Sequence, residues 1–243
     1  MITRRNVAML VAELLGTAIL TFSVLAIAKS AIGIPYFVAI GVGLTLSLLV
    51  LTVGATSGAH VNPAVTLGLW TLRKIDTVRA ILFIVAQFVG AVAAYHLYQY
   101  LVGRSIDNIT APEFSWPVLV AELTGAALFG FGIAAALYQK YEGGKLALTV
   151  GASLALGILV AGVASNGVVN PAVALGVQSW DKAYVVGPLV GAVVGMNVYS
   201  LLFAGENFLG LVPKAPIKKA AAGRSKTVKT TVRTTRKKTA KRK

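Results

Sequence analysis

The strongest constraint on this chain is the length of its apolar stretches. Six of them run for about 20 residues, the length that an α-helix needs to cross the roughly 30 Å hydrocarbon layer of a membrane. Short polar connections such as QKYEGGK separate them. The six predicted spans cover residues 7–28, 34–54, 79–102, 115–138, 145–164 and 183–204. The sequence therefore predicts an all-α polytopic membrane protein with six transmembrane helices.

The charged residues are segregated in a way that fits this interpretation. Hydrophobic residues make up 56% of the chain, and 13 of its 23 Lys and Arg residues lie in residues 214–243, which hold no acidic residue. Outside this segment the charges nearly cancel, so the chain has too little polar surface for a water-soluble domain of its length. The apolar run after Arg5 is too long for a signal peptide and lacks a cleavage pattern, so it is predicted to be the first span.

Basic loop residues predict the orientation, because cytoplasmic loops carry an excess of Lys and Arg. With the N-terminus inside, the cytoplasmic side holds Arg4, Arg5, Arg73, Lys74, Arg79, Lys140 and Lys145 as well as the basic segment. The outside then holds only Lys29, Arg104 and Lys182. We therefore expect an integral protein of the cell membrane with both termini in the cytoplasm.

Two further apolar stretches, residues 61–70 and 169–178, are only half a span long. A ten-residue helix covers about 15 Å, half of the hydrocarbon layer. An Asn-Pro pair stands at or near the start of each, as Asn62-Pro63 and Asn170-Pro171. Pro is favoured at the first position of a helix, and Asn before it is a strong N-cap. The sequence thus predicts two re-entrant half helices that begin at these pairs.

The two halves of the chain are copies of each other. VNPA occurs at residues 61–64 and again at 169–172, and AELLGTAILTF (12–22) resembles AELTGAALFGF (121–131). Each half holds three spans, an odd number, so the second copy must lie upside down relative to the first. The sequence predicts an inverted 3+3 repeat of the kind found in transport folds.

The repeats set the domain boundaries. We expect one channel domain over residues 1–212, with repeat one at about 7–102 and repeat two at about 115–204. Residues 213–243 form a basic tail that is too poor in apolar residues to bury a core and is expected to be disordered. Three roles stay open for it: a solvated cytoplasmic extension, binding to anionic lipid headgroups, or contact with nucleic-acid phosphates.

Inversion brings the N-termini of the two half helices together near the middle of the membrane. Irregular backbone at this depth is tolerated only inside protein or beside a water-filled cavity. Each Asn uses its side-chain oxygen as a cap, so its NH₂ group is left to face such a cavity. Two such donors and two positive helix ends would accept a neutral molecule with an acceptor oxygen and repel a cation.

These motifs resemble the aquaporin and glycerol-facilitator family, the major intrinsic proteins. The resemblance covers about residues 7–205 and rests on SGAHVNPAVTLG (57–68), VVNPAVALG (168–176) and WDKAYVVGPLVGA (180–192). It implies an hourglass-like fold, a homotetramer with one pore per subunit, and passive flow of water or small neutral solutes such as glycerol, urea or ammonia. It assigns the two pore motifs to Asn62, Pro63, Ala64, Asn170, Pro171 and Ala172.

The resemblance also assigns the narrowest part of the pore, the selectivity filter, and here the chain departs from the family. The four filter positions fall on Val42, Ile158, Gly167 and Val173. The family usually has an Arg where this chain has Val173, together with aromatic side chains. Without them the filter loses a fixed positive charge and a fork of donors, and it is expected to be relatively wide and weakly selective. An aliphatic constriction of this kind conducts, or it dewets and acts as a gate.

Three polar residues at membrane depth need partners. Glu13 and Glu122 lie within predicted spans, where a carboxylate is costly. The resemblance implies that each accepts hydrogen bonds from re-entrant backbone and so supports a loop, and the alternative is a proton relay. His60, two residues before Asn62, either braces the loop or lines the cytoplasmic vestibule.

Enzymes and metal proteins are excluded by what the chain lacks. It has two distant His residues, no Cys and no cluster of carboxylates, so we expect no metal, no cofactor and no catalytic site. Two competing functions remain. One is a secondary transporter, which also uses inverted repeats and broken helices. The other is a weakly conducting membrane scaffold whose basic tail binds anionic lipid or nucleic acid.

Overall fold

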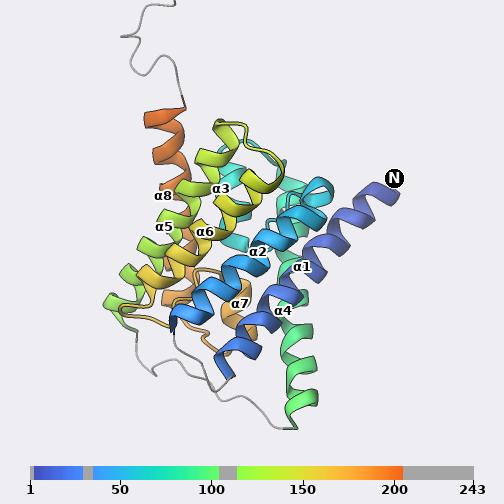
Figure 1. Ribbon diagram of the computed structural model, residues 1–243, viewed down its shortest axis with the longest axis vertical. Helices are drawn as coiled ribbons and strands as arrows, with labels where there is room; N and C mark the ends of the chain where they lie inside the picture. The colour runs from blue at the N-terminus through green and yellow to red at the C-terminus, as the bar shows by residue number, and fades with distance from the viewer. Residues whose placement is uncertain (1–2, 30–34, 104–113, 205–243) are drawn as a thin grey trace, which may run out of the picture.

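The computed structural model describes residues 3–29, 35–103 and 114–204 (Figure 1), and the basic tail lies outside them. Six described helices are long and apolar enough to cross a membrane, which confirms the six predicted spans. They are α1 (Arg4–Lys29), α2 (Pro35–Ser57), α4 (Thr77–Val102), α5 (Trp116–Tyr138), α6 (Gly143–Ala161) and α8 (Lys182–Phe203). The two half helices are also present, as α3 (Pro63–Thr71) and α7 (Pro171–Gly176).

The helix ends differ from the prediction by a few residues, most clearly in α7. This helix was expected to continue to residue 178 but ends at Gly176. Gln178 adopts a left-handed backbone with φ +62°, and the Ser179 N–H turns back to donate to the Ala174 carbonyl at 2.9 Å. Such a closing turn satisfies the free carbonyls of the helix end. The second half helix is therefore shorter than the first.

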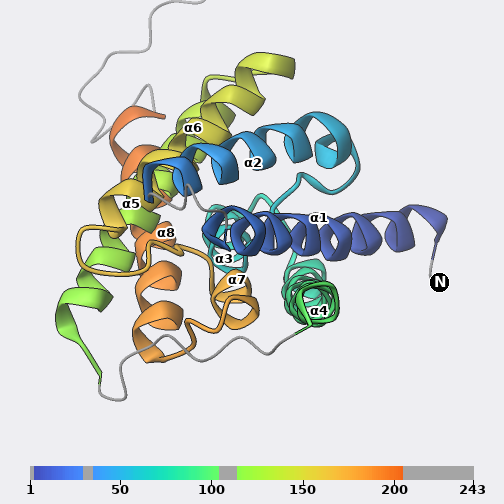
Figure 2. The ribbon, with the colours of Figure 1, turned by 60° about the horizontal axis from the view of Figure 1, so that its bottom comes forward.

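Helix packing follows the inverted repeat. Within each repeat the first helix packs against the last, α1 against α4 and α5 against α8. The half helices cross over, because α3 packs against α8 of the second repeat and α7 packs against α4 of the first. Figures 1 and 2 show α3 and α7 surrounded by the longer helices. The two short helices therefore lie inside the bundle, as the predicted re-entrant segments require.

The repeats join where α2 crosses α6. A Cβ added to Gly43 would lie 2.6 Å from the Gly151 carbonyl oxygen, and a Cβ on Gly151 would overlap the Gly43 carbonyl. These two glycines are repeat mates, 108 residues apart, so the crossing lies on the pseudo-two-fold axis. Only residues without a side chain allow the two backbones to come this close.

The outer surface of the bundle is apolar. Leu44 is 62% exposed, Leu156 51% and Val190 43%, although all three lie in the middle of long helices. In a water-soluble protein such a surface would promote aggregation, whereas in a membrane it faces hydrocarbon. Figure 1 shows the start of α1 and the end of α8 on the same side of the bundle. An even number of spans requires this arrangement.

Candidate pore site

The first half helix begins as its sequence predicts. The Asn62 side-chain oxygen Oδ1 accepts a hydrogen bond from the Ala64 N–H at 2.8 Å, and Pro63 occupies the first helical position. Proline has no N–H to leave unpaired there, and the cap satisfies one of the free donors behind it. All three residues are buried.

The second half helix repeats this geometry. Asn170 Oδ1 accepts from the N–H groups of Ala172 at 3.0 Å and Val173 at 3.3 Å, and Pro171 is the first residue of α7. The two caps hold the asparagine side chains in matching orientations. Both asparagines are only 2% exposed.

The two asparagines also bond across the repeat boundary. Asn62 Nδ2 donates to the Val169 carbonyl at 3.0 Å, and Asn170 Nδ2 donates to the Val61 carbonyl at 2.9 Å. These bonds bring the N-termini of α3 and α7 together. They also modify the expectation that each NH₂ group is wholly free, because one of its two N–H bonds is used by the opposite loop. One N–H of each asparagine remains.

The loops before the half helices adopt a strained backbone. Ala59 and Val61 have φ angles of +50° and +43°, and their repeat mates Gly167 and Val169 have +62° and +47°. Ala59, Val61 and Val169 carry side chains that disfavour such angles, at a cost on the order of 1–3 kcal/mol each, whereas Gly167 adopts its angle freely. The same alternation in both halves shows that the strain belongs to the fold of the loop.

Glu13 holds the first loop in this conformation. Its two carboxylate oxygens accept from the N–H groups of His60 at 3.0 Å and Val61 at 2.7 Å, and from the Ser57 hydroxyl at 2.6 Å. The Ser57 oxygen in turn accepts from the Ala59 N–H at 3.1 Å. The N–H of each strained residue is therefore held by a side-chain oxygen, and that oxygen offsets part of the strain.

Glu122 does the same for the second loop. It accepts from the N–H groups of Val168 at 2.9 Å and Val169 at 2.6 Å, and from the Ser165 hydroxyl at 2.7 Å. The Gly167 N–H donates to the Ser165 oxygen at 3.0 Å. Both glutamates are fully buried, and every one of these partners is a donor, which suits an acceptor-only carboxylate.

Among the described residues, Glu13 has a further side-chain donor that Glu122 lacks, which the sequence reasoning missed. The Gln87 amide on α4 donates to Glu13 at 2.7 Å and to the Thr66 hydroxyl at 3.0 Å. Thr66 donates in turn to the Asn62 carbonyl at 3.1 Å. The repeat mate of Gln87 is Pro188, which makes no such bond. A Gln in the apolar middle of this span, away from its more polar end, was the signal that could have identified this residue.

His60 is turned toward the same polar residues. Its Nδ1 lies 3.2 Å from the Thr66 hydroxyl, and its ring meets the Phe83 ring edge-on at 5.3 Å between centroids. The residue is 8% exposed. These contacts fit a side chain that braces the loop better than one that faces an open vestibule.

The four assigned filter residues are all buried. Val42 and Val173 are each 2% exposed and Ile158 is 7% exposed, so almost none of their surface is open to water. Gly167 lies against Ile158, because an added Cβ would come within 2.7 Å of the Ile158 carbonyl. None of the four carries a polar side chain. The width of the filter stays a prediction.

Comparison with known proteins agrees with this arrangement. Residues 2–199 match the major intrinsic protein family. The chain is 33% identical to aquaporin Z of Photorhabdus laumondii, over 80% of this chain and 97% of that protein, and 30% identical to aquaporin-1 of Mus musculus, over 69% and 67%. The X-ray structure of the aquaglyceroporin from Plasmodium falciparum shares the fold, with a TM-score of 0.65 at 22% identity over 81% of this chain and 96% of that one. The chain belongs to the major intrinsic protein family, the membrane channels that include the aquaporins and aquaglyceroporins.

Proposed function

We propose that this protein is a passive channel for water and small neutral solutes, and that its path passes the paired asparagines. The observation that carries the proposal is the reciprocal pair of hydrogen bonds between Asn62 and Val169 and between Asn170 and Val61. These bonds fix both amides at the meeting point of the half helices. The channels of this family are not enzymes, and the proposal includes no catalytic step.

The remaining N–H of each asparagine has a defined role in this proposal. It donates to the oxygen of a passing water or solute molecule, while the positive ends of α3 and α7 turn that oxygen toward them. The same positive ends oppose a cation. Selection by lining groups and half-helix dipoles is a recognised principle of such pores.

The filter in this proposal is the aliphatic set Val42, Ile158, Gly167 and Val173. It offers no donor or acceptor side chain, so every molecule that enters sheds part of its hydration without replacement. Water and ammonia, which are small, should therefore pass more readily than urea or glycerol. The low exposure of these residues supports a constriction that is dry at rest.

A secondary transporter would need a midplane group that binds a coupling ion. Glu13 and Glu122 are the ionisable candidates in the spans, and both oxygens of each already accept hydrogen bonds from the loops. Those bonds favour a structural role for the glutamates. They also favour a channel without a coupled ion.

Stopped-flow light scattering on proteoliposomes tests the proposal. Vesicles with the protein should shrink or swell faster than empty vesicles when an osmotic gradient drives water or an ammonia gradient drives ammonia. The rates should not saturate as the solute concentration rises. Val173→Arg should restore a charged donor to the filter and narrow its selectivity, most clearly against ammonia and urea. If the permeability of these vesicles to water and to every solute equals that of empty vesicles, the channel proposal is wrong.

Three further features belong to the same proposal. The protein is a homotetramer with one pore per subunit, as the family resemblance implies. Both termini face the cytoplasm, which is supported by the exposed basic residues of the described loops, Arg73, Lys74 and Lys140. The tail binds anionic headgroups, with about 1 kcal/mol of attraction per basic residue near the surface. Sedimentation of a tail peptide with phosphatidylserine vesicles, but not with phosphatidylcholine vesicles, tests the last point.

A further inference from the structure

The inverted repeat gives every filter residue a mate in the other half of the chain. We call the four assigned filter residues, Val42, Ile158, Gly167 and Val173, the outer ring. A shift of 108 residues along the chain relates them to a second set of small or aliphatic residues, Val150, Val50, Ala59 and Val65. We call this second set the inner ring. No residue of either ring has a polar side chain.

The two rings are buried to a similar degree. In the inner ring Val50 is 9% exposed, Val65 3% and Val150 7%, values close to those of the outer ring. Val65 is the third residue of α3, and Val173 is the third residue of α7. Likewise Ala59 and Gly167 both adopt a left-handed backbone before their half helix. Burial and backbone therefore correspond position by position, and two of the four mate pairs carry the same residue type.

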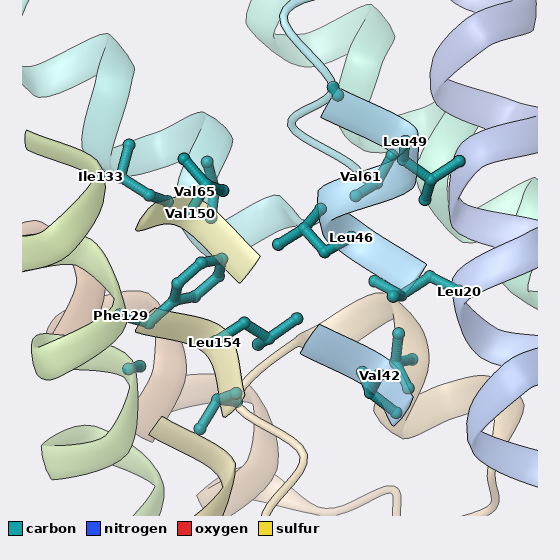
Figure 3. Packing of buried hydrophobic residues seen from close by; sticks show 14 of the residues in the cluster. Leu20, Val42, Leu46, Leu49, Val61, Val65, Phe129, Ile133, Val150 and Leu154 are labelled. Carbon is teal, nitrogen blue, oxygen red and sulfur yellow. The ribbon is translucent and has the colours of Figure 1, made fainter. Parts of the chain in front are cut away.

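The ring members on α2 and α6 lie at opposite ends of these helices' buried stripes. On α2 the residues Val42, Leu46 and Val50 are spaced four apart and form one buried stripe. The copy of this stripe on α6 is Val150, Leu154 and Ile158. Figure 3 shows Val42 and Val150 at opposite ends of the two stripes, with Leu46 and Leu154 between them. Eight residues of helix separate the rings by about 12 Å.

We propose that the inner ring is a second dry constriction, which resists the flow of water through the pore about as strongly as the outer ring does. This inference rests on the proposed channel function, since it names what limits flow through the same path. Passing molecules shed hydration at the outer ring, regain hydrogen bonds at Asn62 and Asn170, and shed hydration again at the inner ring. The pore is then limited by two barriers in series.

Two barriers in series give a quantitative signature. Passage over each barrier slows exponentially with its height. Removing one of two equal barriers leaves the other, so permeability at most doubles. Removing both barriers removes the resistance of both rings to water flow. The factor by which the double variant raises water permeability must therefore exceed the product of the factors for the two single variants. A pore with one filter behaves differently, because one substitution would then give the full increase.

The test uses matched threonine variants at the repeat mates Val65 and Val173. Thr keeps the branched shape of Val and adds a hydroxyl, so Val65→Thr and Val173→Thr wet each ring with little change in width. Val190→Thr, at a 43% exposed position on α8, controls for adding a hydroxyl elsewhere. Water permeability is measured by stopped-flow light scattering on proteoliposomes with equal protein content. Val65→Ala and Val173→Ala, alone and together, form a second set that remains informative if a Thr variant fails to fold.

We expect each single variant to raise water permeability by no more than a factor of two, and the double variant to raise it by more than the product of the singles. A large increase from Val173→Thr alone, with no effect of Val65→Thr, would overturn the inference and leave the outer ring as the single filter. Unchanged permeability in all ring variants of a conducting protein would overturn it too. If neither the wild type nor any variant conducts, the proposed channel function itself fails.

Discussion

At the scale of single residues, the buried glutamates differ in how many donors they hold. Glu122 accepts three hydrogen bonds, from Ser165 and from two loop N–H groups. Glu13 accepts the three equivalent bonds and a fourth from Gln87. A carboxylate can accept all of these, whereas an amide has one acceptor oxygen and turns an NH₂ group toward the remaining donors. Both loops should therefore be destabilised by the same substitution.

We predict that Glu122→Gln lowers the free energy of unfolding by about 1–3 kcal/mol, because it leaves a buried loop donor unpaired. Glu13→Gln should cost about as much, because Gln87 has an unpaired Oε1 that can turn to accept from the new NH₂ group, so that a loop N–H is again the donor left unpaired. Thermal unfolding in detergent measures both effects. Glu142→Gln is the matched control, because Glu142 precedes α6 and makes no side-chain cap bond. Equal melting temperatures for all three variants would contradict a loop-supporting role.

At the scale of helices, matched glycines set how closely each repeat packs. A Cβ on Gly191 of α8 would overlap the Leu123 carbonyl of α5, and a Cβ on Gly90 of α4 would overlap the Leu14 carbonyl of α1. These are equivalent contacts in the two repeats, and they show why the last helix of each repeat carries a glycine there. Without a hydrophobic driving force between helices in lipid, such close packing supplies much of the association.

Adding one methyl group at either glycine should separate these helices. We predict that Gly90→Ala and Gly191→Ala each destabilise the protein by about 1–3 kcal/mol, the usual cost of overpacking. Gly144→Ala is the control, because a Cβ at Gly144 meets nothing within 4 Å. Thermal unfolding, followed by the loss of helical circular dichroism, compares the three variants. Melting temperatures for Gly90→Ala and Gly191→Ala that match the control would show that the helices can move apart freely.

At the scale of the whole molecule, features set by local chemistry could be predicted from the sequence. Asn62-Pro63 starts a helix because capping and the missing proline N–H act within one turn, and the spans follow from apolar length alone. The partners of Glu13 lie 44 to 74 residues away in the chain, so the choice of Ser57 and Gln87 depends on packing that the sequence does not state. The burial of the four residues assigned to the filter depends in the same way on packing, because it follows from how α2 and α6 cross.

We expect the basic tail and the channel to act as separate parts of the molecule. Within the described residues, the bonds that hold the two half helices join residues between Glu13 and Asn170, so we expect the site to form without residues 214–243. Deleting residues 214–243 should therefore leave water permeability per folded protein unchanged, while the loss of 13 positive charges weakens binding to phosphatidylserine vesicles. Stopped-flow light scattering and vesicle sedimentation measure the two effects. Lower flux in a truncated protein with an unchanged melting temperature would instead indicate that the tail regulates the pore.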